Sequence, residues 1–224
     1  MLKRALRYVR SYGIRAAASH LFKKTAYLLF PPARKVFCAR LNDFVLPQEL
    51  AENKENILVI SYRSMDALPP GFVDDLFFKG TIYNLRPASP AMVNEFLDRF
   101  FRESALLWTC FAGKTLVGYL WTYMGSTEYS RVHFFPLGPE DAVILAVEIF
   151  PQFRGNEYLR KLTYFTFAEL KKLGIKRVYT DILLTNRSSL RAFSKATFSS
   201  IGQARMKNFK HSQLVIWRRD NDPR

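Results

Sequence analysis

The chain has 224 residues, of which 49% are apolar and 24% charged, a balance typical of a folded globular protein rather than a disordered one. Its two cysteines are too few for a disulfide framework, and its three histidines are scattered, so no metal site is expected. The formal net charge of +15 indicates that the protein has an anionic partner.

The charge is unevenly distributed along the sequence. Residues 1–42 carry ten Lys or Arg and no Asp or Glu, whereas residues 43–150 carry eight basic and fourteen acidic residues. Residues 151–224 carry sixteen basic and five acidic residues. This asymmetry predicts at least one anionic partner, and the two basic regions need not share it.

Residues 1–45 are interpreted as a basic amphipathic helical arm, followed by a main domain over residues 46–224. Leu2 and Leu6 recur at helical spacing among basic residues, and no apolar run approaches the roughly 20 residues needed to cross a bilayer. Three interpretations stay open: binding of residues 1–42 to an anionic membrane surface, packing of the arm on the domain, or an organelle transit peptide. Without a secretory signal, we expect a cytoplasmic protein, either free or peripheral at the inner face of the membrane.

Strand and helix patterns alternate through the main domain. In chain order they predict a strand over 57–63, a short proline-interrupted helical region, a helix over 89–104, two strands over 106–124, a strand over 142–150, a helix over 154–174, a strand over 176–184, a helix over 186–196, and closing strands near 199–206 and 212–218. The run 142–150 is almost continuously apolar, as expected for a strand buried on both faces. This order predicts an α/β protein with a mixed sheet.

The turn that follows the apolar run 142–150 is the clearest sign of a binding site. Arg154 supplies a cation there, Gly155 lets a ligand approach the backbone, and the first amides of the next helix are unsatisfied. The pattern favours a pyrophosphate site, although an ordinary strand-to-helix turn stays open. NAD and ATP are poor candidates, because the turn lacks the second glycine of a dinucleotide fingerprint and the Lys-Ser pair of an ATP loop.

The order of elements and two motifs resemble the GCN5-related N-acetyltransferase (GNAT) superfamily over roughly residues 57–218. The family's Val-x-Pro-like step and Arg/Gln-x-x-Gly-x-Gly/Ala loop are matched by Ile149-Phe150-Pro151 and Arg154-Gly155-Asn156-Glu157-Tyr158-Leu159. A second motif, Asn-x-x-Ala/Ser-x-x-x-Tyr-x-Lys-x-Gly-Phe, is matched by Asn186, Ser189, Phe193, Lys195, Thr197 and Phe198. The stretch FAGKTLVGYLW is similar to a hairpin of the family that leads into Leu-Val-Gly-Tyr.

The resemblance implies a GNAT-like mixed, splayed sheet of six to seven strands flanked by about four helices, with acetyl-CoA as co-substrate and no metal. It implies cofactor-binding roles for Ile149, Phe150, Arg154, Gly155, Asn156, Glu157, Tyr158, Leu159, Asn186, Ser189, Phe193 and Lys195. The candidate catalytic residues are Glu148 and Asn186. Glu148 is the nearest carboxylate to serve as the base, or else a buried structural partner on the strand face opposite Ile149.

Three departures from the family pattern bear on activity. Glu157 stands where glycine lets the loop approach the phosphates, and two unit charges 4 Å apart at an effective dielectric near 20 repel by about 4 kcal/mol. Leu159 replaces a small residue. Phe193 replaces the tyrosine that, in many relatives, protonates the departing CoA thiolate.

The leading prediction is an N-acetyltransferase that moves an acetyl group directly from acetyl-CoA to an amine of a small or envelope-related acceptor. The alternative is a catalytically decayed GNAT-fold protein with a binding or regulatory role, favoured by the three departures. Nucleic-acid binding is the least favoured hypothesis, because many of the aromatic residues near basic ones occupy expected core positions. No oligomeric state is predicted.

Overall fold

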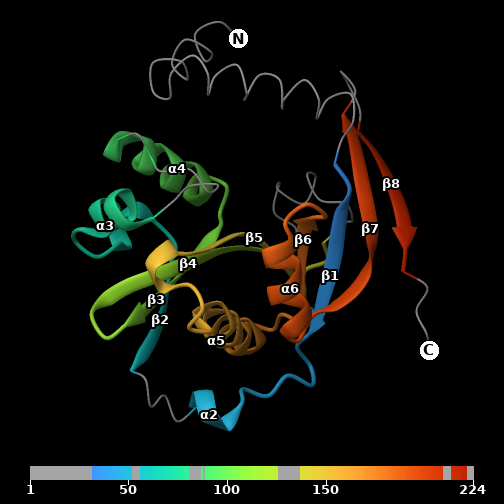
Figure 1. The fold of residues 1–224 in the computed structure, drawn as a ribbon, viewed down its shortest axis with the longest axis horizontal. Coiled ribbons are helices and arrows are strands. Elements are labelled where there is room, and N and C mark those ends of the chain that lie inside the picture. The colour runs from blue at the N-terminus through green and yellow to red at the C-terminus, as the bar shows by residue number, and fades with distance from the viewer. Residues whose placement is uncertain are drawn as a thin grey trace, which may run out of the picture.

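The computed structural model describes residues 32–51, 56–80, 87, 89–125, 137–208 and 213–220 (Figure 1). Its strands are β1 (Arg34–Arg40), β2 (Ile57–Tyr62), β3 (Leu106–Ala112), β4 (Thr115–Met124), β5 (Asp141–Ile149), β6 (Arg177–Leu183), β7 (Ser199–Asn208) and β8 (Gln213–Arg219). Its α-helices are α2 (Gln48–Ala51), α3 (Phe72–Lys79), α4 (Pro90–Arg102), α5 (Tyr158–Lys172) and α6 (Arg187–Lys195). The mixed α/β class predicted from the sequence is confirmed.

The eight strands form one sheet in the order β2-β3-β4-β5-β6-β1-β7-β8. Strands β5 and β6 are parallel, and every other neighbouring pair is antiparallel. The β5–β6 pairing begins at Asp141 and Arg177 and ends at Ile144 and Thr180. Beyond Ile144, β5 stays paired with β4 and leaves β6, so the sheet splays open between its two halves.

A bulge accompanies this splay. The partner on β5 shifts from Val147 to Ile144 as β4 advances from Leu120 to Thr122, so β5 carries one extra residue there. Bulges bend a strand and increase its local twist. The bulge therefore lies where β5 turns away from β6.

Strand β1 corrects the boundary expected for the N-terminal arm. Residues 34–40 pair with β6 on one side and β7 on the other, so this part of the predicted arm lies inside the sheet. Val36 and Phe37 are both buried, at 0% and 1% exposure, and the register with β7 shifts between them. Two successive buried side chains break the alternation by which a strand is recognised in a sequence, and with β1 the sheet has more strands than the six to seven expected. Residues 1–31 of the predicted arm lie outside the described residues.

Two hydrophobic cores cover the two faces of the sheet. One gathers around α5 and α6 and includes Leu162, Phe167 and Phe193. The other gathers around α3 and α4, which lie together in Figure 1, and includes Leu97 and Trp121. Cys110, on the α5 side, is a core residue rather than a nucleophile, because burial raises the pKa of its thiol to about 12.

Two helices are capped at their N-termini by polar side chains. Ser89 caps α4, because its hydroxyl oxygen accepts a hydrogen bond from the Met92 amide at 3.3 Å. Asn186 caps α6 in the same way, with its side chain accepting from the Ser189 amide at 3.2 Å. Helix α5 begins later than predicted, at Tyr158 instead of residue 154, because residues 154–157 form the turn itself.

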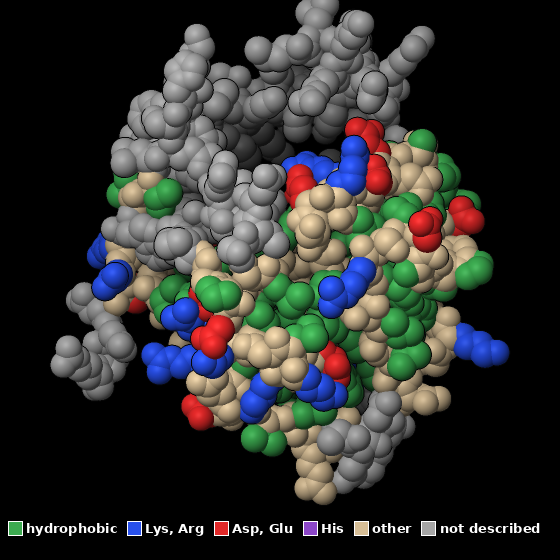
Figure 2. Space-filling model, turned by 180° about the vertical axis from the view of Figure 1, so that it is seen from behind, with side chains coloured by type: hydrophobic (Ala, Val, Ile, Leu, Met, Phe, Trp, Pro, Cys, Tyr) green, Lys and Arg blue, Asp and Glu red, His purple; other side chains and the backbone are tan. Residues whose placement is uncertain are grey.

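The face of the molecule in Figure 2 carries basic and acidic side chains close to one another. Surface charges of the described residues include ion pairs, among them Arg102 with Asp98 at 2.7 Å and Lys176 with Glu140 at 2.6 Å. Paired charges of this kind neutralise one another locally. In the part of the chain that the structure describes, no helix has the length and apolar character needed to cross a membrane.

Candidate active site

The turn between β5 and α5 has the backbone of an anion-binding site. A short 3-10 turn at Pro151–Phe153 is followed by Gly155 (φ 91°) and Glu157 (φ 56°), both in the left-handed region that favours glycine. Glu157 is the N-cap of α5, but its side chain makes no capping hydrogen bond. The first amides of α5 therefore keep their donors for a ligand, and the positive end of the helix dipole favours an anion.

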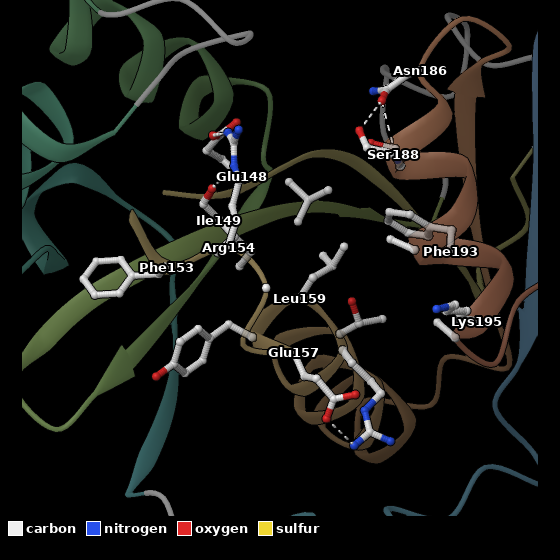
Figure 3. A pocket seen from close by; sticks show the side chains of 18 of the residues that line it. Glu148, Ile149, Phe153, Arg154, Glu157, Leu159, Asn186, Ser188, Phe193 and Lys195 are labelled. Atoms are coloured by element: carbon white, nitrogen blue, oxygen red, sulfur yellow. Dashed lines mark hydrogen bonds and ion pairs between the residues drawn. The ribbon is translucent and has the colours of Figure 1, made fainter. Parts of the chain in front are cut away.

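This turn opens onto a cavity of about 900 Å³ in the splay of the sheet (Figure 3). The end of β5 and the start of α5 form one wall, and α6 forms the opposite wall. The sequence-predicted residues that line it are Glu148, Ile149, Arg154, Gly155, Glu157, Tyr158, Leu159, Asn186, Ser189, Phe193 and Lys195. The two sequence motifs, about thirty residues apart, are thus brought to one site.

Two residues of the predicted set lie elsewhere. Phe150 is fully buried in the core on the α4 side, and its amide donates to the Val117 carbonyl at 2.9 Å, so it cannot contact a ligand in the cavity. Asn156 is exposed in the turn, where its side-chain amide lies 3.4 Å from the Phe153 carbonyl oxygen, and does not line the cavity.

The Ile149 amide points toward the gap in the sheet. Successive N–H groups of a strand point to opposite edges, and the next amide, that of Phe150, is bonded to β4. The Ile149 N–H must therefore point away from β4, toward the open side of β5. Gly118 lies opposite Ile149 in the ladder and permits the close approach of β4 and β5 there.

Arg154, the cation expected at the mouth of the site, lines the cavity and is paired. Its Nη2 donates to Glu148 Oε1 at 2.6 Å, and its Nε donates to the Ile149 carbonyl at 3.0 Å. The Glu148 side chain is only 9% exposed, whereas that of Arg154 is 53% exposed. A nearly buried carboxylate needs such a partner, so the pair ties the end of β5 to the turn that follows it.

Glu157 turns its carboxylate away from the turn. Its side chain is 61% exposed and lies 3.0 Å from Nη2 of Arg160, a dashed contact in Figure 3. The same Arg160 Nη2 contacts Glu49 of α2, also at 3.0 Å. Arg160 lines the cavity but was missed by the sequence analysis. Its spacing of three residues from Glu157 in a helix was the signal that could have indicated the pair.

The wall formed by α6 combines a polar donor with an apolar surface. Asn186 Oδ1 accepts from Ser188 Oγ at 3.0 Å as well as from the Ser189 amide, so a ligand can use only the Nδ2 donor of this side chain. Phe193 is 3% exposed and packs against Phe198, with ring centroids 5.2 Å apart. Lys195 adds an exposed positive charge to the rim of the cavity.

The fold and this site define an acyltransferase-like protein with a cavity at the splay of a mixed sheet. A model of the Acetyltransferase (GNAT) family matches residues 73–198, and the chain belongs to this family. Members of the family transfer an acetyl group from acetyl-CoA.

Solved structures agree with this fold. The GCN5-related glucosamine N-acetyltransferase region of a fungal multi-domain GH3 β-N-acetylglucosaminidase is 13% identical, with a TM-score of 0.53 over 83% of this chain and 22% of that one. A GNAT-family acetyltransferase from Colwellia psychrerythraea is also 13% identical, with a TM-score of 0.52 over 84% of this chain and 56% of that one. This chain thus spans about a fifth of the length of the first protein and about half of the length of the second. No curated protein matches the sequence significantly.

Proposed function

We propose that this protein is an N-acetyltransferase that moves the acetyl group of acetyl-CoA directly to an amine of a small or envelope-related acceptor. The observation that carries the proposal is the uncapped, left-handed turn before α5, which opens onto the cavity and whose Glu157 carboxylate pairs with Arg160 instead of the turn's amides. Such a turn fits a pyrophosphate, because backbone amides and the helix dipole together favour an anion without a capping side chain.

The cavity also suits the rest of the co-substrate. Amides of residues 155–159 would hold the pyrophosphate, and the Asn186 Nδ2 group would donate to the pantetheine arm in the gap between β5 and α6. The apolar surface of Phe193 would flank that arm. Lys195, at the rim, would add a cation for the remaining phosphate charge.

The chemistry would be a single displacement. The acceptor nitrogen attacks the thioester carbonyl carbon, the C–S bond breaks, and CoA leaves as a thiolate that takes up a proton. The Ile149 amide, directed into the gap, would donate to the oxyanion as it forms, and one such donor contributes about 3 to 4 kcal/mol in other acyl-transfer enzymes. Glu148 would accept the proton of the amine once Arg154 has released its carboxylate. Phe193 cannot donate a proton, so solvent would protonate the thiolate.

A decayed binding protein is the second candidate, and the absence of a hydroxyl at Phe193 is the observation that favours it. Calorimetry with acetyl-CoA, together with release of the free CoA thiol in the presence of amines, separates the two. Binding with turnover supports the transferase. A protein that binds no acetyl-CoA would instead have the regulatory role.

Replacing Asn156 with aspartate should weaken acetyl-CoA binding about tenfold, because it adds one negative charge, with almost no change of shape, to the turn proposed to hold the pyrophosphate. The dissociation constant measured by calorimetry at fixed ionic strength tests this. Gln152→Glu is the matched control, since it adds the same charge on an exposed residue of the preceding 3-10 turn, before the amides proposed to hold the pyrophosphate. Equal affinity for both variants and the natural protein would place the phosphates elsewhere.

We also propose that the basic N-terminal residues bind an anionic membrane surface. Because residues 34–40 form a strand inside the sheet, a truncation that tests this should begin at residue 32 and leave β1 intact. The full chain should sediment with vesicles that contain anionic lipid, and the truncated chain should not. Neutral vesicles are the control, and equal sedimentation of both chains would contradict the membrane proposal.

A further inference from the structure

Glu157 places a carboxylate in the turn proposed to hold the pyrophosphate. It is the N-cap residue of α5 and stands directly before the amides of the first helical turn. Those are the amides proposed to hold the phosphates. Left free, the Glu157 carboxylate would be drawn to them by the same helix dipole that attracts a phosphate.

The Glu157 carboxylate instead pairs with Arg160. Its Nη2 group contacts Glu157 Oε2 and Glu49 Oε1, each at 3.0 Å, so the guanidinium is held between α5 and α2. The side chain is 34% exposed, and its Nε is buried with no acceptor among the described residues. Leu50, next to Glu49, is buried in the hydrophobic core on the α5 side and so holds Glu49 near α5.

We propose that Arg160 is a positioning residue that holds the Glu157 carboxylate away from the start of α5 and so keeps the pyrophosphate site open. The proposal rests on the proposed function, because it concerns the same turn. It assigns to Arg160 a role that acts through Glu157. A direct ion pair between Arg160 and the phosphates is the competing explanation, and it makes a different prediction for a double variant.

Affinity for CoA separates the two explanations. Arg160→Gln should weaken CoA binding about tenfold, as expected when one anion is released into the site. Combining Arg160→Gln with Glu157→Gln should restore binding to within about threefold of the natural protein, because the competing carboxylate is gone. Arg160→Lys, which keeps a cation near Glu157, should bind almost as well as the natural protein. A double variant that stays as weak as Arg160→Gln would overturn the proposal in favour of direct phosphate binding.

A second measurement needs no cofactor. In Arg160→Gln, the freed Glu157 carboxylate should cap α5 and slow hydrogen exchange at the amides of residues 158–160, compared with the natural protein. The double variant should lose this protection. Unchanged exchange in Arg160→Gln would overturn the positioning role, whether or not the protein binds CoA. Failure of the natural protein to bind CoA would, in contrast, refute only the proposed function.

Lys172→Gln is the matched control for both measurements. Lys172 pairs with Glu169 at the same three-residue spacing on the same helix, at 2.7 Å, but in the last turn of α5. Twelve residues of helix separate it from Arg160, a distance of about 18 Å. Lys172→Gln should leave CoA affinity and the hydrogen exchange of residues 158–160 unchanged. If it changed them as much as Arg160→Gln does, the effect of Arg160→Gln would be explained by the loss of one positive charge from α5.

Discussion

Replacing Gly118 with alanine should abolish acetyl transfer and lower the free energy of unfolding by about 2 to 3 kcal/mol. A Cβ atom at this position would lie 2.5 Å from the Glu148 carbonyl oxygen and 3.1 Å from the Ile149 Cα. Both contacts are with backbone, so β5 must shift at the residues that carry the proposed oxyanion donor and base. Chemical denaturation and release of CoA thiol measure the two effects.

Gly113→Ala provides the control in the same hairpin. Gly113 has a φ of 59°, and a Cβ atom there would meet nothing within 4 Å. Its substitution should cost only about 1 kcal/mol from the left-handed backbone and leave the transfer rate unchanged. If Gly118→Ala proved as mild as Gly113→Ala, the close approach of β4 and β5 would not be needed for the site.

Glu148→Gln should lower kcat by about 10² or more, the contribution typical of a general base, with little change in the affinity for acetyl-CoA. Glutamine keeps the shape of the side chain and can still accept a hydrogen bond from Arg154, so the turn should remain in place. Binding by calorimetry and kcat by thiol release separate the chemical role from a structural one.

Glu169→Gln is the control for that substitution, because Glu169 is exposed in the last turn of α5 and pairs only with Lys172 among the contacts described. It should leave kcat unchanged. A rate for Glu148→Gln within a few-fold of the natural protein would assign Glu148 to the structural ion pair with Arg154. The base would then be another group or a water.

The sequence by itself determined the features that depend on neighbouring residues. Serine followed by proline at 89–90 predicted the start of α4, and the apolar run 142–150 predicted β5, because caps and hydrophobic patterns are local properties. The spacing of the two motifs identified the family and most of the residues that line the cavity. Glu157 was also recognised as the departure most relevant to phosphate binding.

Only the tertiary structure decided the features that depend on distant segments. Strand β1 became part of the sheet through pairing with β6 and β7, more than 130 residues later in the chain, and its two successive buried residues, Val36 and Phe37, hid it from a search for alternation. Arg154 proved to be bound to Glu148, and the Glu157 carboxylate proved to be bound to Arg160, which also contacts Glu49, 111 residues away. The partner of a side chain depends on how helices and strands pack together. Packing brings residues that are far apart in the sequence into contact, and nothing in the sequence near either residue indicates that contact.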